Sequence, residues 1–256
     1  MRPKILCIQF RNNKNSVEQE QASIEREAGV YTDVDFISAT DLTINWNAPA
    51  ELMSEYSGLI LGGSGEFDFD GNREADDPAK MTTFEFVDRL DALFCYLFEE
   101  DVPTLGICYG HQLLGYFKGA QVKYDVVQKK TCSHEVKLVV DKEDHFLFSN
   151  LPDSFQAHYG HKDALDRVPE GAKLIMCGGD KCKVSALRYK NNIFTTQFHP
   201  EMNFEDMVIR IKNSPGYLPE GSVFEEIFKD DIHSNTILQN FSKFVAMKAD
   251  TQVSVD

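Results

Sequence analysis

The sequence has no long hydrophobic run and far fewer basic than acidic side chains. Its most apolar N-terminal stretch, 4–10, is short and gives way at once to polar residues, so we predict neither a signal peptide nor a membrane span. The 41 acidic and 26 basic side chains leave a formal charge of -15 over 256 residues. Binding a phosphate backbone needs a clustered basic surface, so this balance argues against a nucleic-acid partner and favours solubility.

The cysteines show no C-x-x-C spacing of the kind that binds metal. Without an export signal they are expected to be reduced thiols in a cytoplasmic protein. The acidic stretch 66–78 begins like a calcium-binding loop but lacks the rest of that pattern, including its terminal glutamate. We expect no metal and no cofactor, and we interpret 66–78 as a solvated loop. A lid or a substrate-selecting role stays open for it and for the segment 203–231.

The sequence also lacks internal repeats, low-complexity tracts and linkers. A chain of this length with 42% hydrophobic residues can bury one substantial core. We therefore predict a single domain over 1–248, followed by a flexible tail at 249–256.

Apolar periodicity in the first half alternates between strands and helices. Short apolar runs predict strands at Lys4–Phe10, Tyr31–Ser38, Gly58–Leu61 and Val102–Cys108. Helical spacing predicts helices that begin at Ser16, which can act as an N-cap, at Thr82 and at Gly110. Such alternation indicates a parallel sheet with helices on both faces, in which ligands bind beyond the carboxyl ends of the strands.

The second half changes to short β-type runs separated by Gly, Pro, Asp and Asn: 134–140, 154–160, 172–177, 183–189 and 192–198. We expect these runs to extend the sheet with antiparallel strands. The last helical segment begins near Ser234, a second candidate N-cap, and carries one apolar stripe. Together the patterns predict an α/β, flavodoxin-like fold with a mostly parallel sheet, helices on both faces and an antiparallel extension.

One cysteine differs from the other five, for which we expect packing alone. In the stretch TLGICYGHQLLG, 104–115, Cys108 lies between Gly106 and Gly110 where a strand meets a helix. Such a sharp turn lifts a nucleophile above the sheet, and the flanking glycines relieve crowding. The following helix points its positive amino end at the sulfur, which favours the thiolate.

A nucleophilic thiol needs a base that a third group orients. The stretch TTQFHPEM, 195–202, provides His199 at the end of the last β run and Glu201 two residues later. Pro200 fixes a bend between them, so that Glu201 can turn back to His199. The predicted triad is therefore Cys108, His199 and Glu201, in that chain order.

The two motifs together resemble the class I, triad-type glutamine amidotransferase domain, here as a stand-alone chain. Its nucleophile turn runs G-x-C-x-G-x-Q and its base lies in an H-P-E segment, and both occur here in the right order about 90 residues apart. GLILGGSG, 58–65, is similar to the family's oxyanion-loop strand, and 159–175 to its S-H-x-D segment. The resemblance covers most of the chain. It implies cysteine-dependent hydrolysis of a glutamine or γ-glutamyl amide through a γ-glutamyl thioester.

The resemblance also implies a role for each matching residue. Cys108 attacks the side-chain amide carbonyl, His199 accepts and returns the proton, and Glu201 orients His199. Backbone N–H groups hold the oxyanion, those of Tyr109 and of Gly63 or Ser64. Side chains bind the substrate, those of Gln112, His161 and Asp163, although for His161 and Asp163 a structural role stays open.

Two positions depart from the family's pattern. The turn GGSG, 62–65, replaces the common S-G-G-P or S-N-G-P, so the choice between Gly63 and Ser64 as oxyanion donor stays open. Gly160 stands where the family has a serine before the S-H-x-D histidine, so one substrate contact is replaced or lost.

Three functions are compatible with these residues. The first is the glutaminase component of a two-chain amidotransferase, which passes ammonia to a separate synthase, because no synthetase domain follows residue 245. The second is a free-standing γ-glutamyl peptide hydrolase, which uses the same chemistry up to the leaving amine. The third, a catalytically silent regulatory module, is disfavoured by the complete triad. The sequence does not choose between the first two.

Overall fold

The computed structural model describes residues 2–142, 145–213, 221 and 223–253. Within them, nine strands form the main sheet: β1 (Lys4–Gln9), β2 (Asp33–Ser38), β3 (Gly58–Leu61), β4 (Thr104–Ile107), β6 (Lys130–Leu138), β7 (Ser154–His161), β9 (Ala172–Cys177), β10 (Ala186–Tyr189) and β11 (Ile193–Thr196). Two three-residue strands, β5 (Val122–Tyr124) and β8 (Asp163–Leu165), form a small second sheet. The sequence did not predict these two strands, because each is too short to show a period.

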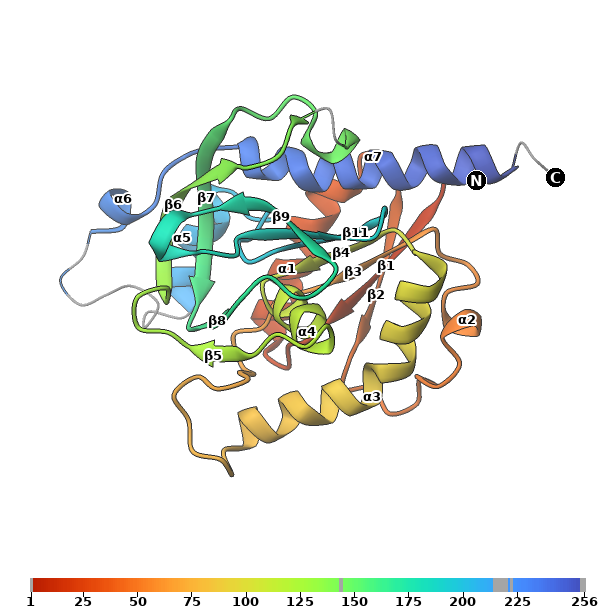
Figure 1. Cartoon of the computed structure of the whole chain (residues 1–256), viewed down its shortest axis with the longest axis horizontal. Helices are drawn as coiled ribbons and strands as arrows, with labels where there is room; N and C mark the ends of the chain where they lie inside the picture. Colours follow the sequence, from red (N-terminus) through yellow and green to blue (C-terminus); the bar gives the residue numbers. More distant parts are fainter. Residues whose placement is uncertain (1, 143–144, 214–220, 222, 254–256) are drawn as a thin grey trace.

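The main sheet runs in the order β2-β1-β3-β4-β11-β10-β9-β6-β7 (Figure 1). Strands β2, β1, β3, β4 and β11 are mutually parallel, and β10, β9, β6 and β7 continue the sheet in antiparallel pairs. The predicted flavodoxin-like fold with an antiparallel extension is therefore confirmed. Since β4 and β11 are parallel neighbours, their carboxyl ends meet at one edge of the sheet.

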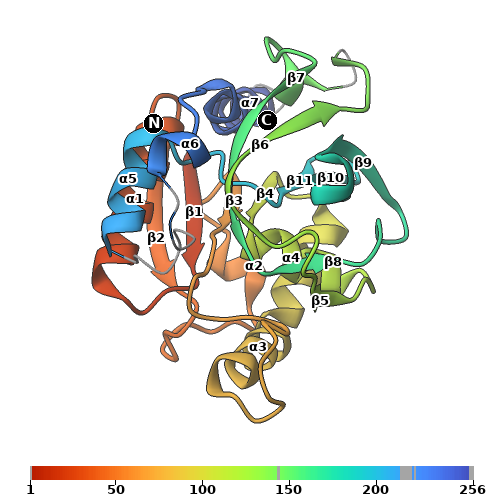
Figure 2. The ribbon, with the colours of Figure 1, turned by 90° about the vertical axis from the view of Figure 1, so that its left-hand side faces the viewer.

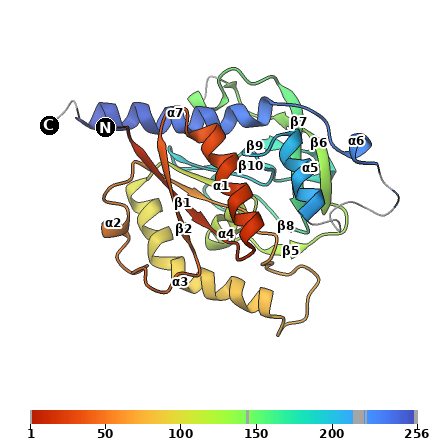
Figure 3. The same cartoon turned by 180° about the vertical axis from the view of Figure 1, so that it is seen from behind.

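Helices cover both faces of the sheet. The helices are α1 (Lys14–Ala28), α2 (Pro49–Leu52), α3 (Pro78–Glu100), α4 (Tyr109–Phe117), α5 (Phe204–Asn213), α6 (Phe224–Ile227) and α7 (His233–Val253), with 3-10 turns η2 (Phe146–Phe148) and η3 (Gly179–Lys181). Figure 3 shows α1, α5 and α7 on one face, and Figure 1 shows α3 and α4 on the other. Two separate buried clusters match this division: Ile24 of α1 and Phe241 of α7 pack in the first, Phe86 of α3 and Leu113 of α4 in the second.

Helix starts differ from the sequence prediction because side chains outside the apolar stripe cap them. The side chain of Asn13 accepts a hydrogen bond from the backbone N–H of Ser16, so α1 begins two residues earlier than expected. Asp77 caps α3 in the same way, and Pro78 fits its first turn. Ser234 lies inside α7 and its buried hydroxyl has no partner among the described residues, so the predicted cap is wrong.

The structure describes much of the two segments whose role was open. In the acidic loop 66–78 the side chains of Phe67 and Phe69 are buried beside α3, so the loop is not simply solvated. The expected tail from residue 249 is helical as far as Val253, and 254–256 lie outside the described residues. Part of the segment 203–231 forms α5, which packs beside α1 (Figure 2), while 214–220 and 222 lie outside the described residues.

Over the described ranges, every helix is too short or too polar to span a lipid bilayer.

Candidate active site

Cys108 lies in a strained turn between β4 and α4. Its φ of 51° and ψ of -90° fall in a region that residues with a side chain rarely adopt, at a cost of about 1–3 kcal/mol. Both flanking glycines are sterically required, because a Cβ on Gly106 would lie 2.8 Å from Gly110 O and one on Gly110 would lie 2.4 Å from Leu61 O. The glycines thus allow α4 to start against β3 and present Cys108 at the carboxyl edge of the sheet.

His199 and Glu201 follow β11 and form a buried pair. His199 Nδ1 lies 2.7 Å from Glu201 Oε1. The other ring nitrogen, Nε2, makes no hydrogen bond with any described residue, yet Cys108 is close enough to affect the protonation of the ring. The predicted residues therefore meet at one edge of the sheet, with Glu201 at Nδ1 of the imidazole and Cys108 near the ring.

The charges in this pair keep the imidazole protonated. Burial lowers the pKa of His199, but the nearby carboxylate of Glu201 and the Cys108 sulfur outweigh burial and raise it to about 9. For Glu201 burial raises the pKa, while His199 and Arg210 outweigh that effect and lower it. The site thus favours an imidazolium beside a carboxylate at neutral pH.

Three distant elements fix the turn that carries His199. The backbone N–H of His199 donates to His158 O of β7 at 2.9 Å. Arg26 of α1 donates to Glu201 O at 2.8 Å, and Asn235 of α7 donates to Pro200 O at 2.9 Å. These contacts fix the turn in addition to the pairing of β11 with β4, the strand that leads into Cys108.

The turn expected to hold the oxyanion lies directly against the pair. A Cβ on Gly63 would lie 3.1 Å from His199 Cε1 and 3.7 Å from Cys108 Cβ. The N–H of Gly63 donates to Glu20 Oε1 at 3.0 Å. By contrast, the N–H groups of Ser64 and Tyr109 have no acceptor among the described residues.

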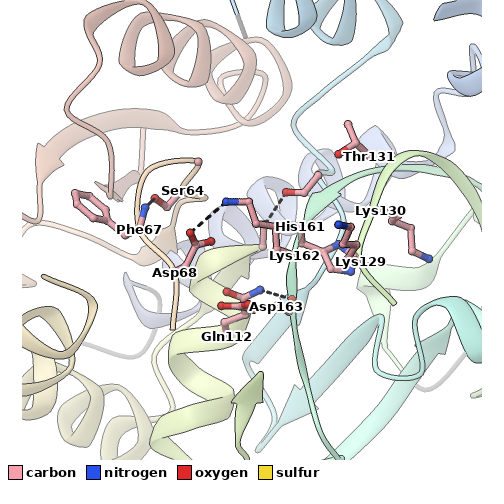
Figure 4. Close-up of a pocket in the computed structure, with 13 residues that line it drawn as sticks. Ser64, Phe67, Asp68, Gln112, Lys129, Lys130, Thr131, His161, Lys162 and Asp163 are labelled. Atoms are coloured by element: carbon pink, nitrogen blue, oxygen red, sulfur yellow. Dashed lines mark hydrogen bonds and ion pairs between the residues drawn. The ribbon is translucent and has the colours of Figure 1, made fainter. Parts of the chain in front are cut away.

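A cavity of about 430 Å³ opens above Cys108 (Figure 4). The turn 62–65 and the acidic loop line one side of the cavity, and residues near the start of β6 and the end of β7 line the other. The complete set of lining residues among those described is Ser64, Gly65, Phe67, Asp68, Cys108, Gln112, Lys129, Lys130, Thr131, Gly160, His161, Lys162 and Asp163. Lys162 reaches across to Asp68, with Nζ 3.3 Å from Oδ2. This volume is in the range of small-molecule sites.

The side-chain amide of Gln112 connects the helix after Cys108 to both neighbouring walls. Its Nε2 donates to Asp163 O at 2.8 Å and lies 3.3 Å from Gln197 Oε1, while Gln197 Nε2 lies 3.6 Å from Cys108 Sγ. The carboxylate of Asp163 accepts from the N–H groups of Asp70 and Gly71 at 2.8 and 2.7 Å. Asp163 therefore ties the acidic loop to the cavity wall.

His161 lines the cavity with both ring nitrogens unpartnered among the described residues. Burial, together with the charges of Lys130 and His199, lowers its pKa to about 3, so the ring is neutral. A neutral imidazole with a free donor and a free acceptor is suited to contact a polar substrate. The backbone carbonyl oxygen of Gly160, where the sequence departs from the family's pattern, lies 3.9 Å from Cys108 Sγ.

Sequence reasoning missed four residues that support the site. Glu20 holds Gly63, Gln197 contacts Cys108, and Arg26 and Asn235 fix the His199 turn. No signal in the sequence marked them, because α1 carries many other polar side chains and polarity alone does not indicate a partner. In the part of the chain that is described, no group of three or more His, Cys, Asp or Glu side chains could hold a metal ion.

Comparisons with known proteins place most of the chain in one family. The profile of the family described as "Glutamine amidotransferase class-I" matches residues 10–210. The chain is 40% identical over 102 residues to a glutamine-hydrolysing GMP synthase subunit of Methanocaldococcus jannaschii, which is 40% of this chain and 52% of that protein. It is 31% identical over 155 residues to the protein of the same name from Archaeoglobus fulgidus, covering 60% of this chain and 71% of the relative. The chain thus spans about half the length of the first relative.

Solved structures share the fold. A glutamine amidotransferase from Thermotoga maritima superposes with a TM-score of 0.70 at 19% identity, covering 96% of this chain and 99% of that one. At this identity the likeness concerns the fold alone. Since the family profile spans most of the chain, the protein belongs to the class-I glutamine amidotransferase family.

Proposed function

We propose that this amidotransferase cleaves the γ-amide bond of glutamine or a γ-glutamyl compound through a thioester on Cys108. The observation that carries the proposal is the strained Cys108 turn, which faces a buried His199–Glu201 pair with an Nδ1 to Oε1 distance of 2.7 Å. This arrangement supports the roles of Cys108 as nucleophile, His199 as base and Glu201 as orienting carboxylate.

In the reacting form His199 already holds the proton of Cys108 as an imidazolium, and the sulfur attacks the γ-carbonyl carbon of the substrate. The carbon–sulfur bond forms while the carbonyl electron pair moves to oxygen, giving a tetrahedral oxyanion. The oxyanion then collapses and the carbon–nitrogen bond breaks. The His199 imidazolium donates its proton to the departing nitrogen, so that ammonia or an amine leaves and a γ-glutamyl thioester remains.

In the second step water attacks the thioester. His199 accepts a proton from the water and keeps it as the imidazolium, a second oxyanion forms, and the carbon–sulfur bond breaks with its electron pair returning to the Cys108 sulfur. Glutamate leaves and the enzyme is restored. Glu201 stays ionised throughout and stabilises the imidazolium form of His199.

Two features support the stabilisation of the oxyanion. The N–H groups of Tyr109 and Ser64 are without acceptors among the described residues, and Ser64 lines the cavity with Cys108. Each such donor is typically worth about 2.7–4 kcal/mol in the transition state. His161 and Gln112 line the same cavity and would bind polar groups of the substrate.

The names of the relatives favour glutamine as substrate and ammonia as product. By analogy with the glutamine-hydrolysing subunits of GMP synthase, the chain would pass ammonia to a separate synthase chain. The amidotransferase domain would span residues 1–248.

The cavity gives a specific reason for a second candidate, a free-standing γ-glutamyl peptide hydrolase. Glutamine has about ten non-hydrogen groups, which occupy at most roughly 300 Å³ at roughly 30 Å³ for each water-sized group. The cavity volume of about 430 Å³ exceeds this. Lys129, Lys130 and Lys162 line it, and a leaving amine that carries a carboxylate would find positive charge there.

Release of glutamate by the purified chain tests both candidates. L-glutamine and a set of γ-glutamyl dipeptides are compared in parallel, with Cys108→Ala as the blank. Strong turnover of dipeptides with little glutaminase activity selects the hydrolase, and glutamine turnover that rises when the synthase chain is added selects the two-chain amidotransferase. Activity that survives in Cys108→Ala would rule out the thioester route.

A further inference from the structure

Glu20 contacts the oxyanion turn from a helix that contributes nothing to the predicted triad. It lies in α1 with 1% of its surface exposed. Its carboxylate accepts three hydrogen bonds: from Gln9 Nε2 at 2.9 Å, from Arg11 Nε at 3.0 Å and from the backbone N–H of Gly63 at 3.0 Å. A buried carboxylate with three donors is a fixed group, because moving it would leave charged and polar atoms unpaired.

The backbone groups of the preceding residue, Gly62, are also held. Gly62 N–H donates to Ile8 O of β1 at 3.0 Å, and Gly62 O accepts from the N–H of Gly110 at 3.1 Å. The packing is close on the Glu20 side too, since a Cβ on Gly62 would lie 3.0 Å from Glu20 Oε1. Glu20 therefore completes a set of contacts that determines how the peptide planes of the turn are oriented.

We propose that Glu20 is a positioning residue that makes Ser64, and not Gly63, the oxyanion donor of this turn. The N–H of Gly63 is occupied by the carboxylate, while the next N–H along the chain, that of Ser64, has no acceptor among the described residues. Ser64 lines the cavity together with Cys108. The inference rests on the proposed thioester mechanism and adds to it the choice between two donors that the sequence left open.

The negative charge of Glu20 strengthens its hydrogen bond to the backbone N–H of Gly63. A carboxylate accepts a backbone N–H more strongly than a neutral oxygen does. Arg11 keeps this charge paired in the interior, with side-chain exposures of 4% for Arg11 and 1% for Glu20. Arg11 also approaches the turn directly, because a Cβ on Gly63 would lie 3.0 Å from its Nη2.

The test compares Glu20→Gln and Glu20→Ala with the wild-type chain on one γ-glutamyl substrate. Glu20→Gln keeps the shape and a neutral acceptor for Gly63, whereas Glu20→Ala removes the acceptor. We expect kcat to fall about 10-fold for Gln and about 100-fold for Ala, with KM within about twofold, because a displaced donor weakens only the transition state. A γ-glutamyl aldehyde, which forms a tetrahedral adduct with Cys108, should lose affinity by the same factors as kcat/KM.

Two controls separate this role from a general loss of structure. Asp101→Asn alters a carboxylate that likewise accepts backbone N–H groups in a turn, those of Asn191 and Asn192, away from the site. Glu18→Gln removes one negative charge from the exposed side of α1. Both should keep kcat and the aldehyde affinity.

The outcomes decide between the alternatives. Unchanged or increased kcat in both Glu20 variants would overturn the proposal, and an increase would mean that the carboxylate withholds Gly63 from the oxyanion. A lower kcat with a raised KM, but without loss of aldehyde affinity, would also overturn it. If Glu20→Ala does not fold, the graded loss in Glu20→Gln decides. A wild-type chain that hydrolyses nothing and is not acylated at Cys108 removes the thioester mechanism itself, whereas an active wild type with unaffected Glu20 variants removes only this inference.

Discussion

The backbone N–H of Cys108 donates to the carbonyl oxygen of Thr196 at 2.7 Å. Thr196 is the last residue of β11, the strand that leads into His199. The nucleophile turn is thus hydrogen-bonded to the strand that positions its base. Because backbone hydrogen bonds and contacts from β7, α1 and α7 also anchor the His199 turn, removing the side chain of Cys108 or His199 should change activity without loss of the fold.

Cys108→Gly should stabilise the protein relative to Cys108→Ala, and both should be inactive. The φ of 51° and ψ of -90° at this position strain any residue with a Cβ, and glycine relieves that strain. We expect a gain of about 1 kcal/mol in the free energy of unfolding, measured by urea denaturation. An alanine variant as stable as the glycine variant would mean that the turn is not strained.

Single substitutions in the predicted triad should be graded in their effect on kcat/KM. Cys108→Ala should cost most, His199→Gln nearly as much and Glu201→Gln less, because the amide still hydrogen-bonds the ring although without charge. The three values are measured on one substrate, with circular dichroism as the check of folding. A folded Glu201→Gln as inactive as Cys108→Ala would replace the orienting role by direct participation.

The rate of acylation should fall on the alkaline side with an apparent pKa near 9. The His199 imidazolium must protonate the leaving nitrogen, and its pKa is raised to about 9 by Glu201 and Cys108 against the effect of burial. Glu201→Gln removes one of these charges, so the alkaline limb of kcat/KM should move to lower pH. A shift to higher pH, or none, would show that Glu201 does not act through the charge of His199.

Stability should also decline as the pH rises from about 6.5 to about 9. The pKa of His199 is higher in the folded protein than its ordinary value of 6.5, so the folded state binds the extra proton more tightly. The stabilisation is therefore complete below pH 6.5 and is lost as the pH passes 9. Urea denaturation at several pH values checks this, and His199→Gln should flatten the slope in that window.

Asp163 should control the acidic loop more than the chemistry. Its carboxylate accepts the N–H groups of Asp70 and Gly71, and Asp163→Ala leaves both without that partner at a cost of about 1–3 kcal/mol. We expect faster proteolysis within 66–78 and a raised KM, with kcat reduced less than KM rises. Asp166→Ala, at an exposed position after β8, is the control. Equal protease resistance of both variants would contradict the role in the loop.

Local patterns were sufficient for the framework of the fold. The predicted strand Gly58–Leu61 has those bounds in the structure, and the stripe of α7 that includes Ile237 and Phe241 is buried as expected. The spacing of apolar residues predicts which face of a helix or strand will be buried, and this prediction does not require knowing which element packs against that face. The glycines around Cys108 and the short spacing between His199 and Glu201 are also local patterns, so the sequence alone could predict them.

Tertiary structure alone decided which groups surround the candidate nucleophile. Glu20 reaches Gly63 across 43 positions of the chain, and Asp163 reaches Asp70 across 93. Nothing in the residues near Glu20 distinguishes it from the other acidic residues of an amphipathic helix. Its contact exists because α1 packs on the sheet beside the end of β3. The sequence by itself therefore determined that a Cys, a His and a Glu would meet at one edge of a parallel sheet. Only the packing of distant segments decided which backbone N–H is left for the oxyanion, because hydrogen bonds between such segments depend on the whole arrangement of the chain.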